Sequence, residues 1–266
     1  MKNLYIPILT LLLFTETETF SQSNLDVEMV FVEGGEFIMG SNWNPVCSPE
    51  HKVNVPSFYI GKYEITQEQW VEVMGELPKS KDGKYTSKSL ELGCPKCPVE
   101  GVEYDEVMLF IEKLNTLSGQ NYRLPTESEW EFAAIGGNKS KGFFFSGGNN
   151  AEKIGWTIKN SDTQTHPVGL KQPNELGIFD MNGNVFEVCS DWFNDYNTPK
   201  ENQSKEFHIL RGGGYNDFYV SKINWLKLRI PFSYRTKDDI RQMANQTYPT
   251  YYPLSSVGLR LSKNSK

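Results

Sequence analysis

The second half of the sequence carries almost no helical periodicity, and this constrains the fold more than any other feature. After Ala134 the chain offers glycine, asparagine, proline and aromatic residues in short bursts, with polar stretches at residues 198–205 and 236–256. Such a pattern suits short strands and irregular loops. Because the chain also carries 16 Phe, 13 Tyr and 6 Trp among its 266 residues, we expect a loop-rich fold with large buried rings.

Helical patterns are confined to the first half. Two capping boxes, Thr66 with Gln69 and Thr126 with Glu129, each open a short segment of apolar residues at helical spacing. Asp105 is expected to cap a longer amphipathic helix that ends at a glycine. The sequence between residues 75 and 98 is polar and predicts a long loop.

Strand patterns open the chain. Residues 29–32 and 36–39 are expected to pair as a hairpin across a Gly34-Gly35 turn, and residues 53–60 resume strand-like composition. No repeat or linker divides the chain. The sequence therefore predicts one α+β domain over residues 25–266.

The N-terminus has the composition of a secretory signal. A basic start is followed by an apolar run over residues 4–14, which is too short to span a bilayer. We expect residues 1–22 to be a cleaved signal peptide, with an uncleaved anchor as the alternative. The mature chain would then be secreted, periplasmic or held at the cell surface, with no membrane span.

Net charge argues against nucleic acid as a partner. The chain carries 27 Lys and Arg against 33 Asp and Glu, which gives a net charge of -6. No run of basic residues forms the stripe that neutralises a phosphate backbone.

Four cysteines, Cys47, Cys94, Cys97 and Cys189, are disulfide candidates in an exported chain. Their connectivity stays open, because four cysteines allow three pairings. Cys94 and Cys97 stand in a C-x-x-C spacing, so a redox dithiol or half of a zinc site is the alternative for that pair.

Several segments in a fixed order resemble the formylglycine-generating-enzyme (sulfatase-modifying factor) family along the whole mature chain. The most specific are YRLPTESEWEFAA and NELGIFDMNGNVFE, accompanied by MVFVEGGEFIMGS, FYIGKYEITQEQW, LRGGGY and VGLRL. The resemblance implies a C-type-lectin-like fold with little regular secondary structure and, commonly, bound calcium. The best-known members oxidise a sulfatase cysteine to formylglycine with copper and molecular oxygen.

The calcium expectation falls on one segment. Asp180 and Glu187 bring hard oxygen side chains close together in sequence, as calcium favours. By resemblance, these two side chains and the carbonyls of Gly183 and Val185 form the site. An EF-hand is excluded, since Val185 stands where that loop needs glycine. The alternative is a turn held by side-chain hydrogen bonds.

We do not expect this chain to bind copper as active relatives do. In active relatives two cysteines follow a GGSY motif, and here their positions hold Asp217 and Lys222, while Gly214 replaces the serine. A carboxylate and an ammonium do not replace the soft thiolates that copper(I) prefers. The carboxylates Glu127 and Glu131, one helical turn apart, are expected to be solvated or capping charges instead of an acid/base pair.

Two functional hypotheses follow. The first is a non-catalytic binding or scaffolding module for a protein, peptide or glycan, with ligand contacts from five residues near the altered motif: Tyr215, Asn216, Asp217, Phe218 and Trp225. The second is an active oxidase with relocated metal ligands. The missing cysteine pair favours the first.

Overall fold

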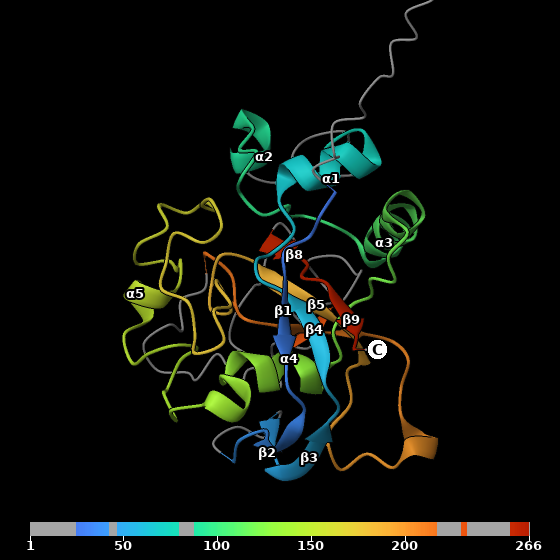
Figure 1. The fold of residues 1–266 in the computed structure, drawn as a ribbon, viewed down its shortest axis with the longest axis vertical. Helices are drawn as coiled ribbons and strands as arrows, with labels where there is room; N and C mark the ends of the chain where they lie inside the picture. Colours follow the sequence, from blue (N-terminus) through green and yellow to red (C-terminus); the bar gives the residue numbers. More distant parts are fainter. Residues whose placement is uncertain (1–24, 43–46, 80–87, 217–229, 233–255, 266) are drawn as a thin grey trace, which may run out of the picture.

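Strands from opposite ends of the chain pair in one central sheet. The computed structural model describes residues 25–42, 47–79, 88–216, 230–232 and 256–265. Within it, β1 (Met29–Val32), β4 (Phe58–Gly61) and β9 (Ser262–Asn264) form an antiparallel sheet in the order β1-β4-β9. The first and last strands therefore flank β4, as Figure 1 shows at the centre of the molecule.

Two further sheets complete the strand content of the described chain. β2 (Gly35–Met39) pairs with β3 (His51–Val55) at the lower end of Figure 1. β5 (Phe186–Trp192), β6 (His208–Arg211), β7 (Ile230–Phe232) and β8 (Val257–Gly258) form a mixed sheet in the order β7-β6-β5-β8. Its β5 and β8 strands run parallel.

The expected hairpin across Gly34-Gly35 is wrong. Its two strands exist, but β1 pairs with β4 and β2 pairs with β3. Val32 and Phe37, one from each strand, are both buried in the same apolar cluster. Gly34 and Gly35 therefore connect two strands that belong to different sheets. By pairing within its own sheet, each strand buries its apolar side chains against this cluster.

The helices lie mostly where capping residues predicted them. Their bounds are α1 (Gln67–Met74), α2 (Lys88–Leu92), α3 (Tyr104–Ser118), α4 (Glu127–Ala134) and α5 (Ala151–Ile154), with 3-10 turns η2 (Gly137–Lys139) and η3 (Lys200–Asn202). Both capping boxes are confirmed, at Thr66 and at Thr126. The helix α3 begins earlier than expected, with Glu103 and not Asp105 as its N-cap. The loop expected after residue 75 contains α2.

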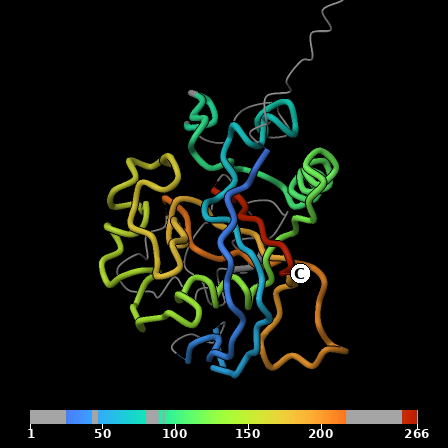
Figure 2. The backbone as a smooth tube through the Cα atoms, in the orientation of Figure 1, coloured from blue at the N-terminus to red at the C-terminus, as the bar shows by residue number. Residues whose placement is uncertain are grey.

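Two apolar clusters form the core of a single domain. In one, the Trp70 ring of α1 stacks on the Phe110 ring of α3 at 4.9 Å, and in the other Trp130 of α4 is fully buried. Outside these two clusters the second half of the chain runs mainly as long loops. Figure 2 shows such loops between α4 and β5 and again between β5 and β6. The predicted loop-rich α+β fold is confirmed.

The helices of the described chain are all too short or too polar to cross a membrane. The expected signal peptide, residues 1–22, lies outside the described residues and stays a prediction.

Candidate functional site

A buried network of charges joins the sequence segments that stand out most. From β6, Arg211 reaches α4, where its Nη1 lies 3.0 Å from Glu127 Oε1 and its Nη2 2.6 Å from Glu131 Oε2. Arg211 and Glu131 have no solvent exposure, and Glu127 retains 4%. The expectation that these carboxylates are solvated is therefore wrong. They neutralise an arginine from a distant strand.

A second arginine, Arg260, forms an ion pair with Glu187 of β5. Arg260 donates to both oxygens of Glu187, from Nε to Oε2 at 2.9 Å and from Nη2 to Oε1 at 2.7 Å. Its remaining donors bind the carbonyl oxygens of Gly61 and Phe179. Trp130 Nε1 also donates to Glu187 Oε2, at 2.7 Å. The Glu187 carboxylate thus receives hydrogen bonds from a helix and from the C-terminal segment.

Both guanidinium groups are held in the charged form. Burial alone would lower the pKa of Arg211, but the carboxylates of Glu131 and Glu127 raise it above its ordinary value. Burial likewise opposes the charge of Arg260, and Glu187 raises its pKa. These pairs are structural, because each carboxylate accepts hydrogen bonds from a fully buried arginine.

Three buried carboxylates face Arg260. Glu64, Asp180 and Glu187 are exposed by 1%, 2% and 0%. Burial, reinforced by Asp180 and Glu187, raises the pKa of Glu64 well above its ordinary value. Burial also raises the pKa of Asp180 from 3.8 to about 6. One buried guanidinium group therefore faces more than one buried acidic group. Burying this many ionisable groups together is electrostatically costly.

Asp180 has the most unusual environment in this cluster. Its backbone lies in the left-handed region, with φ of 58°. Its Oδ2 accepts a hydrogen bond from the Gly169 N–H at 2.7 Å. Its Oδ1 is buried without a hydrogen-bond partner among the described residues. A buried acceptor in this state is a position where a cation or a water could supply the missing contact.

The four expected calcium ligands are brought together only in part. Asp180 fits a calcium ligand, because one hard oxygen is unused. Glu187 does not fit in this arrangement, since Arg260 and Trp130 occupy both its oxygens. Gly183 has φ of 81°, and the Val185 N–H donates to Glu64 Oε1. Among the described residues, no three His, Cys, Asp or Glu side chains are arranged to hold a metal ion.

Two contributors to this cluster, Glu64 and Arg260, did not stand out in the sequence. Glu64 accepts from Asn184 Nδ2 at 2.7 Å and from the Val185 N–H at 3.2 Å, across a separation of more than a hundred residues. Neither residue belongs to a recognisable chemical motif. The one available hint was a lone arginine inside the otherwise apolar VGLRL segment.

The four cysteines divide into one disulfide and two buried thiols. Cys94 and Cys97 are joined by a disulfide, so the zinc alternative does not describe this pair here. Cys47 and Cys189, both with 0% exposure, form no disulfide. The expectation that they were disulfide candidates is corrected. Each thiol packs inside the domain, and burial raises the pKa of Cys189 well above its ordinary value.

Thiol titration checks this assignment. In the native protein, a thiol-reactive disulfide reagent should modify neither Cys47 nor Cys189, because both are buried. At Cys189 a raised pKa also suppresses the reactive thiolate. Under denaturing conditions without reductant, two thiols should react, and prior reduction should release two more. Labelled peptides identified by mass spectrometry provide the count. Labelling of Cys94 or Cys97 in the unreduced chain would contradict it.

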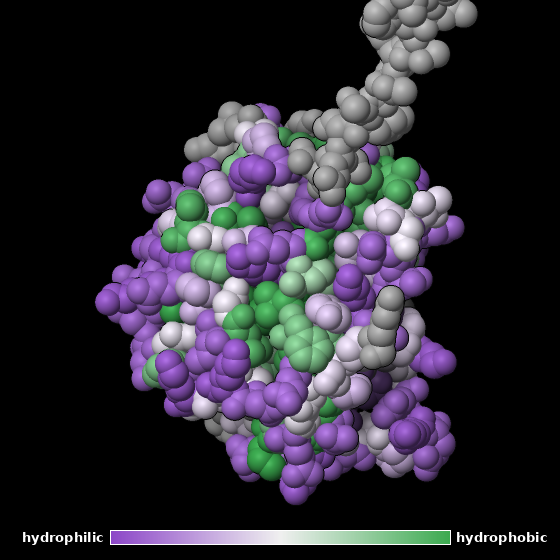
Figure 3. Space-filling view, viewed as in Figure 1, coloured by the Kyte–Doolittle hydropathy of each residue, from purple (hydrophilic) through white to green (hydrophobic). Residues whose placement is uncertain are grey.

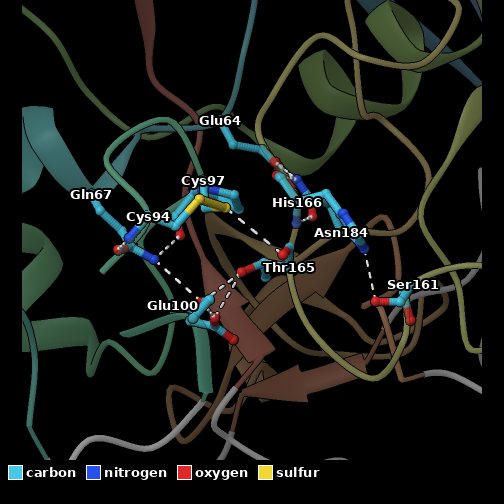
Figure 4. The surroundings of a disulfide bond; sticks show 11 residues. Glu64, Gln67, Cys94, Cys97, Glu100, Ser161, Thr165, His166 and Asn184 are labelled. Carbon is cyan, nitrogen blue, oxygen red and sulfur yellow. Dashed lines mark hydrogen bonds between the residues drawn. A yellow bond between two sulfur atoms is a disulfide. The ribbon is translucent and has the colours of Figure 1, made fainter. Parts of the chain in front are cut away.

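The disulfide sits at the start of α1, within a polar network shown in Figure 4. Gln67 Oε1 accepts from the Cys94 N–H at 3.0 Å, and the Gln67 N–H donates to the Cys97 carbonyl. Nearby, Thr165 Oγ1 donates to Glu100 Oε1 at 2.9 Å, and the His166 N–H donates to Asn184. The disulfide loop therefore satisfies the first backbone donors of α1 and is held in place.

The predicted binding residues are described only in part. Tyr215 is 6% exposed, its N–H donates to the Asn184 carbonyl, and its own carbonyl accepts from Ser161 Oγ at 2.8 Å. Tyr215 is therefore part of the core in this structure. Asn216 is partly exposed. The other members of the set, Asp217, Phe218 and Trp225, and the second copper position, Lys222, lie outside the described residues.

Gly214, which stands where the motif has serine, is closely packed. A Cβ atom there would lie 3.1 Å from Ser256 Oγ and 3.2 Å from the Phe186 ring. A serine at this position would require its neighbours to move.

Comparisons with known proteins agree on one family. The model of the sulfatase-modifying factor enzyme 1-like domain matches residues 14–265. Chaperone protein LppX of Paenibacillus barcinonensis is 32% identical over 263 residues, which cover 80% of this chain and 86% of LppX. The formylglycine-generating enzyme of Streptomyces coelicolor is 29% identical over 178 residues, which are 58% of this chain and about half, 52%, of that enzyme.

A solved structure shows the same architecture. Treponema denticola variable protein 1 superposes with a TM-score of 0.67 at 26% identity, over 89% of this chain and 95% of that protein. The likeness is therefore one of the whole domain.

Proposed function

Because this chain belongs to the sulfatase-modifying factor enzyme 1-like family, we propose that it uses the family's C-type-lectin-like, α+β fold as an exported, non-catalytic binding or scaffolding module. The observation that carries the proposal is the state of the thiols. Every cysteine precedes the Gly212-Gly213-Gly214 motif in sequence, and the two copper positions after it hold Asp217 and Lys222.

The existing cysteines are poorly suited to replace the missing pair. Copper(I) chemistry of this kind needs two thiolates that meet the metal and the substrate. Cys94 and Cys97 are bonded to each other, while Cys47 and Cys189 are buried in the core. The buried carboxylates of Glu127 and Glu131 in α4 are likewise paired with Arg211 and are therefore poorly placed to act as an acid or a base.

The similarity to a protein named as a chaperone supports a role in binding. LppX matches over 86% of its length, so the likeness extends to its whole domain and not to one motif. We propose that this chain binds a protein, peptide or glycan. The region after Tyr215, including Asn216, Asp217, Phe218 and Trp225, stays our prediction for contacts with this ligand.

We also propose calcium as a structural ligand at Asp180. The unused Asp180 oxygen and the surplus of buried carboxylates support it. Calcium at this position would offset negative charge that Arg260 neutralises only in part. With Glu187 bound to Arg260, backbone carbonyls and water would have to supply the remaining ligands.

A direct assay separates the binding module from the alternative, an oxidase with relocated ligands. The purified chain is incubated with copper, oxygen and a peptide carrying Cys-x-Pro-x-Arg, and mass spectrometry measures aldehyde formation. We expect no conversion above a no-protein background, while a formylglycine-generating enzyme assayed in parallel converts the peptide. Conversion that disappears in a Cys94→Ala, Cys97→Ala variant would establish the oxidase and reject the proposal.

A further inference from the structure

The loop that carries the disulfide lies at the upper end of Figure 1, next to α1 and α2. Its four residues are Cys94, Pro95, Lys96 and Cys97. Figure 3 shows polar and apolar side chains mixed over this end of the molecule. Neither the charge network around Arg260 nor the binding region proposed after Tyr215 uses these four residues.

The two cysteines of the loop differ in exposure. Cys97 is 2% exposed, whereas Cys94 is partly exposed. Pro95 and Lys96, which separate the two, are both exposed. A thiolate from another molecule therefore approaches the pair at Cys94 and not at Cys97. One accessible cysteine beside a buried, resolving cysteine is an arrangement that suits thiol–disulfide exchange.

Hydrogen bonds hold the loop in place independently of the bond between the two sulfur atoms. The carbonyl oxygens of residues 94, 95, 96 and 97 accept from the N–H groups of Cys97, Glu68, Val168 and Gln67, respectively, at 2.8, 3.0, 3.0 and 2.8 Å. The Cys94 N–H donates to Gln67 Oε1 at 3.0 Å. Because every carbonyl of the loop is bound to a backbone donor, the loop can keep its path when the disulfide opens.

The disulfide itself adds little to this anchoring. Cys94 and Cys97 are three positions apart, so the bond closes a short loop. A short loop constrains the unfolded chain less than a crosslink between distant segments does. Stabilisation of the fold is therefore a weak reason for this bond.

The surroundings of the pair also suit its reduced form. Cys97 Sγ lies 3.7 Å from the Thr165 carbonyl oxygen, a contact drawn in Figure 4, so a Cys97 thiol can donate to that oxygen. The N-terminus of α1 lies against the loop, and the partial positive charge there favours a departing thiolate. The loop therefore accommodates both redox states of the pair.

We propose that Cys94 and Cys97 form a redox-active pair that oxidises two thiols of a partner polypeptide to a disulfide. The pair is in the disulfide form in this fold, so it can accept two electrons. This activity goes beyond the proposed binding function, and it requires neither copper nor molecular oxygen.

The exchange proceeds in two steps that balance. A thiolate of the partner attacks Cys94 Sγ, the bond between Cys94 and Cys97 breaks, and Cys97 leaves as a thiolate that takes up a proton. The second thiolate of the partner then attacks the partner sulfur of the mixed disulfide, and Cys94 leaves and takes up the second proton. The partner loses two electrons and two protons, and the pair gains both.

A single-turnover reaction tests the activity. The full chain in its disulfide form is mixed at neutral pH with an excess of a reduced peptide that contains two cysteines, without copper or oxygen. Mass spectrometry should find one peptide disulfide formed per chain, with Cys94 and Cys97 now open to alkylation. Cys47→Ala and Cys189→Ala each remove a buried thiol outside the pair, so both control variants should give the wild-type yield.

Trapping of the mixed disulfide tests the direction of attack. In Cys97→Ser, the remaining Cys94 thiol should form a stable mixed disulfide with the oxidised form of the same peptide. Cys94→Ser should do so at least tenfold more slowly, because Cys97 is buried. A purely structural disulfide would not produce this difference.

The proposal is overturned if the folded chain oxidises no peptide, or if the two serine variants trap the peptide at equal rates. It is also overturned if reduction of the pair abolishes the near-ultraviolet circular dichroism of the native chain, because the disulfide is then structural. If a serine variant does not fold, the yield and the circular dichroism of the wild type decide. Aldehyde formation is measured separately, so this proposal can fail while the binding module stands.

Discussion

Replacing Arg260 by Met should lower the free energy of unfolding by about 3 to 5 kcal/mol, measured by denaturant unfolding. The substitution keeps much of the side-chain volume but removes the charge from a fully buried position. Glu187 would lose both of its guanidinium bonds, and the carbonyls of Gly61 and Phe179 would lose their donors. The three buried carboxylates would then have no cation among them.

The matched control is Arg123→Met. Arg123 also binds one carboxylate, that of Glu129, through two hydrogen bonds of 2.7 Å each, but its side chain is 33% exposed. Water screens such a pair, so the loss should be about 1 kcal/mol or less. If Arg260→Met does not fold, Arg260→Lys provides a milder variant that should still be clearly destabilised. Equal losses at the two arginines would show that the buried cluster is not the source of the effect.

Asp180→Asn should stabilise the calcium-free protein at pH 7 and remove part of its pH dependence. In the fold the pKa of Asp180 is about 6, against an ordinary 3.8. The folded state therefore binds the proton more tightly than the unfolded state, and stability falls as pH rises from about 4 to about 7. Ionising this side chain costs on the order of 3 kcal/mol. Asparagine does not ionise and tolerates the left-handed backbone at this position.

Unfolding curves in EDTA between pH 4 and pH 7 measure the effect. Asp162→Asn is the control, because Asp162 also has a positive φ, of 53°, but is exposed. That variant should follow the wild-type curve. An Asp180→Asn protein less stable than wild type at pH 7 would show that the charged form of Asp180 is needed even without a cation.

Calcium should largely cancel the difference in stability between the two proteins. At a hundredfold excess over its dissociation constant, a bound ion would stabilise the wild type by about 2.7 kcal/mol. Asp180→Asn should lose most of that gain, because the variant lacks the unused carboxylate oxygen. If calcium leaves the wild type unchanged, the calcium proposal fails, while the pH dependence in EDTA stands as a separate result.

Local features of the fold were predictable because their causes lie within a few residues. The capping boxes at Thr66 and Thr126 each place donor and acceptor three positions apart, so the sequence contains the whole interaction. The glycines at 34 and 35 are different, because a tight turn and a passage between sheets require the same residues. Which one occurs depends on partners such as β4 that lie far along the chain.

The candidate site was less predictable for the same reason. Glu127 and Glu131 lie one turn apart on a helix, and nothing local indicates that Arg211 approaches from more than seventy residues away. Asp180 and Glu187 were identified through resemblance, but the partner that decides their chemistry, Arg260, lies in a third segment. Because Asp180 and Glu187 are close in sequence, they suggested a shared metal site. In the fold, Glu187 forms an ion pair with Arg260, and one Asp180 oxygen has no hydrogen-bond partner among the described residues.

The pairing of β9 with β4 also bears on how this protein is made. Asn264 lies opposite Phe58 and Ser262 opposite Ile60, so the central sheet joins residues about two hundred positions apart. Arg260, which neutralises Glu187, belongs to the same terminal segment. A ribosome that still holds this segment keeps the sheet open and the acidic cluster without its guanidinium. The domain therefore closes only after residues 260–264 have been released for pairing with β4.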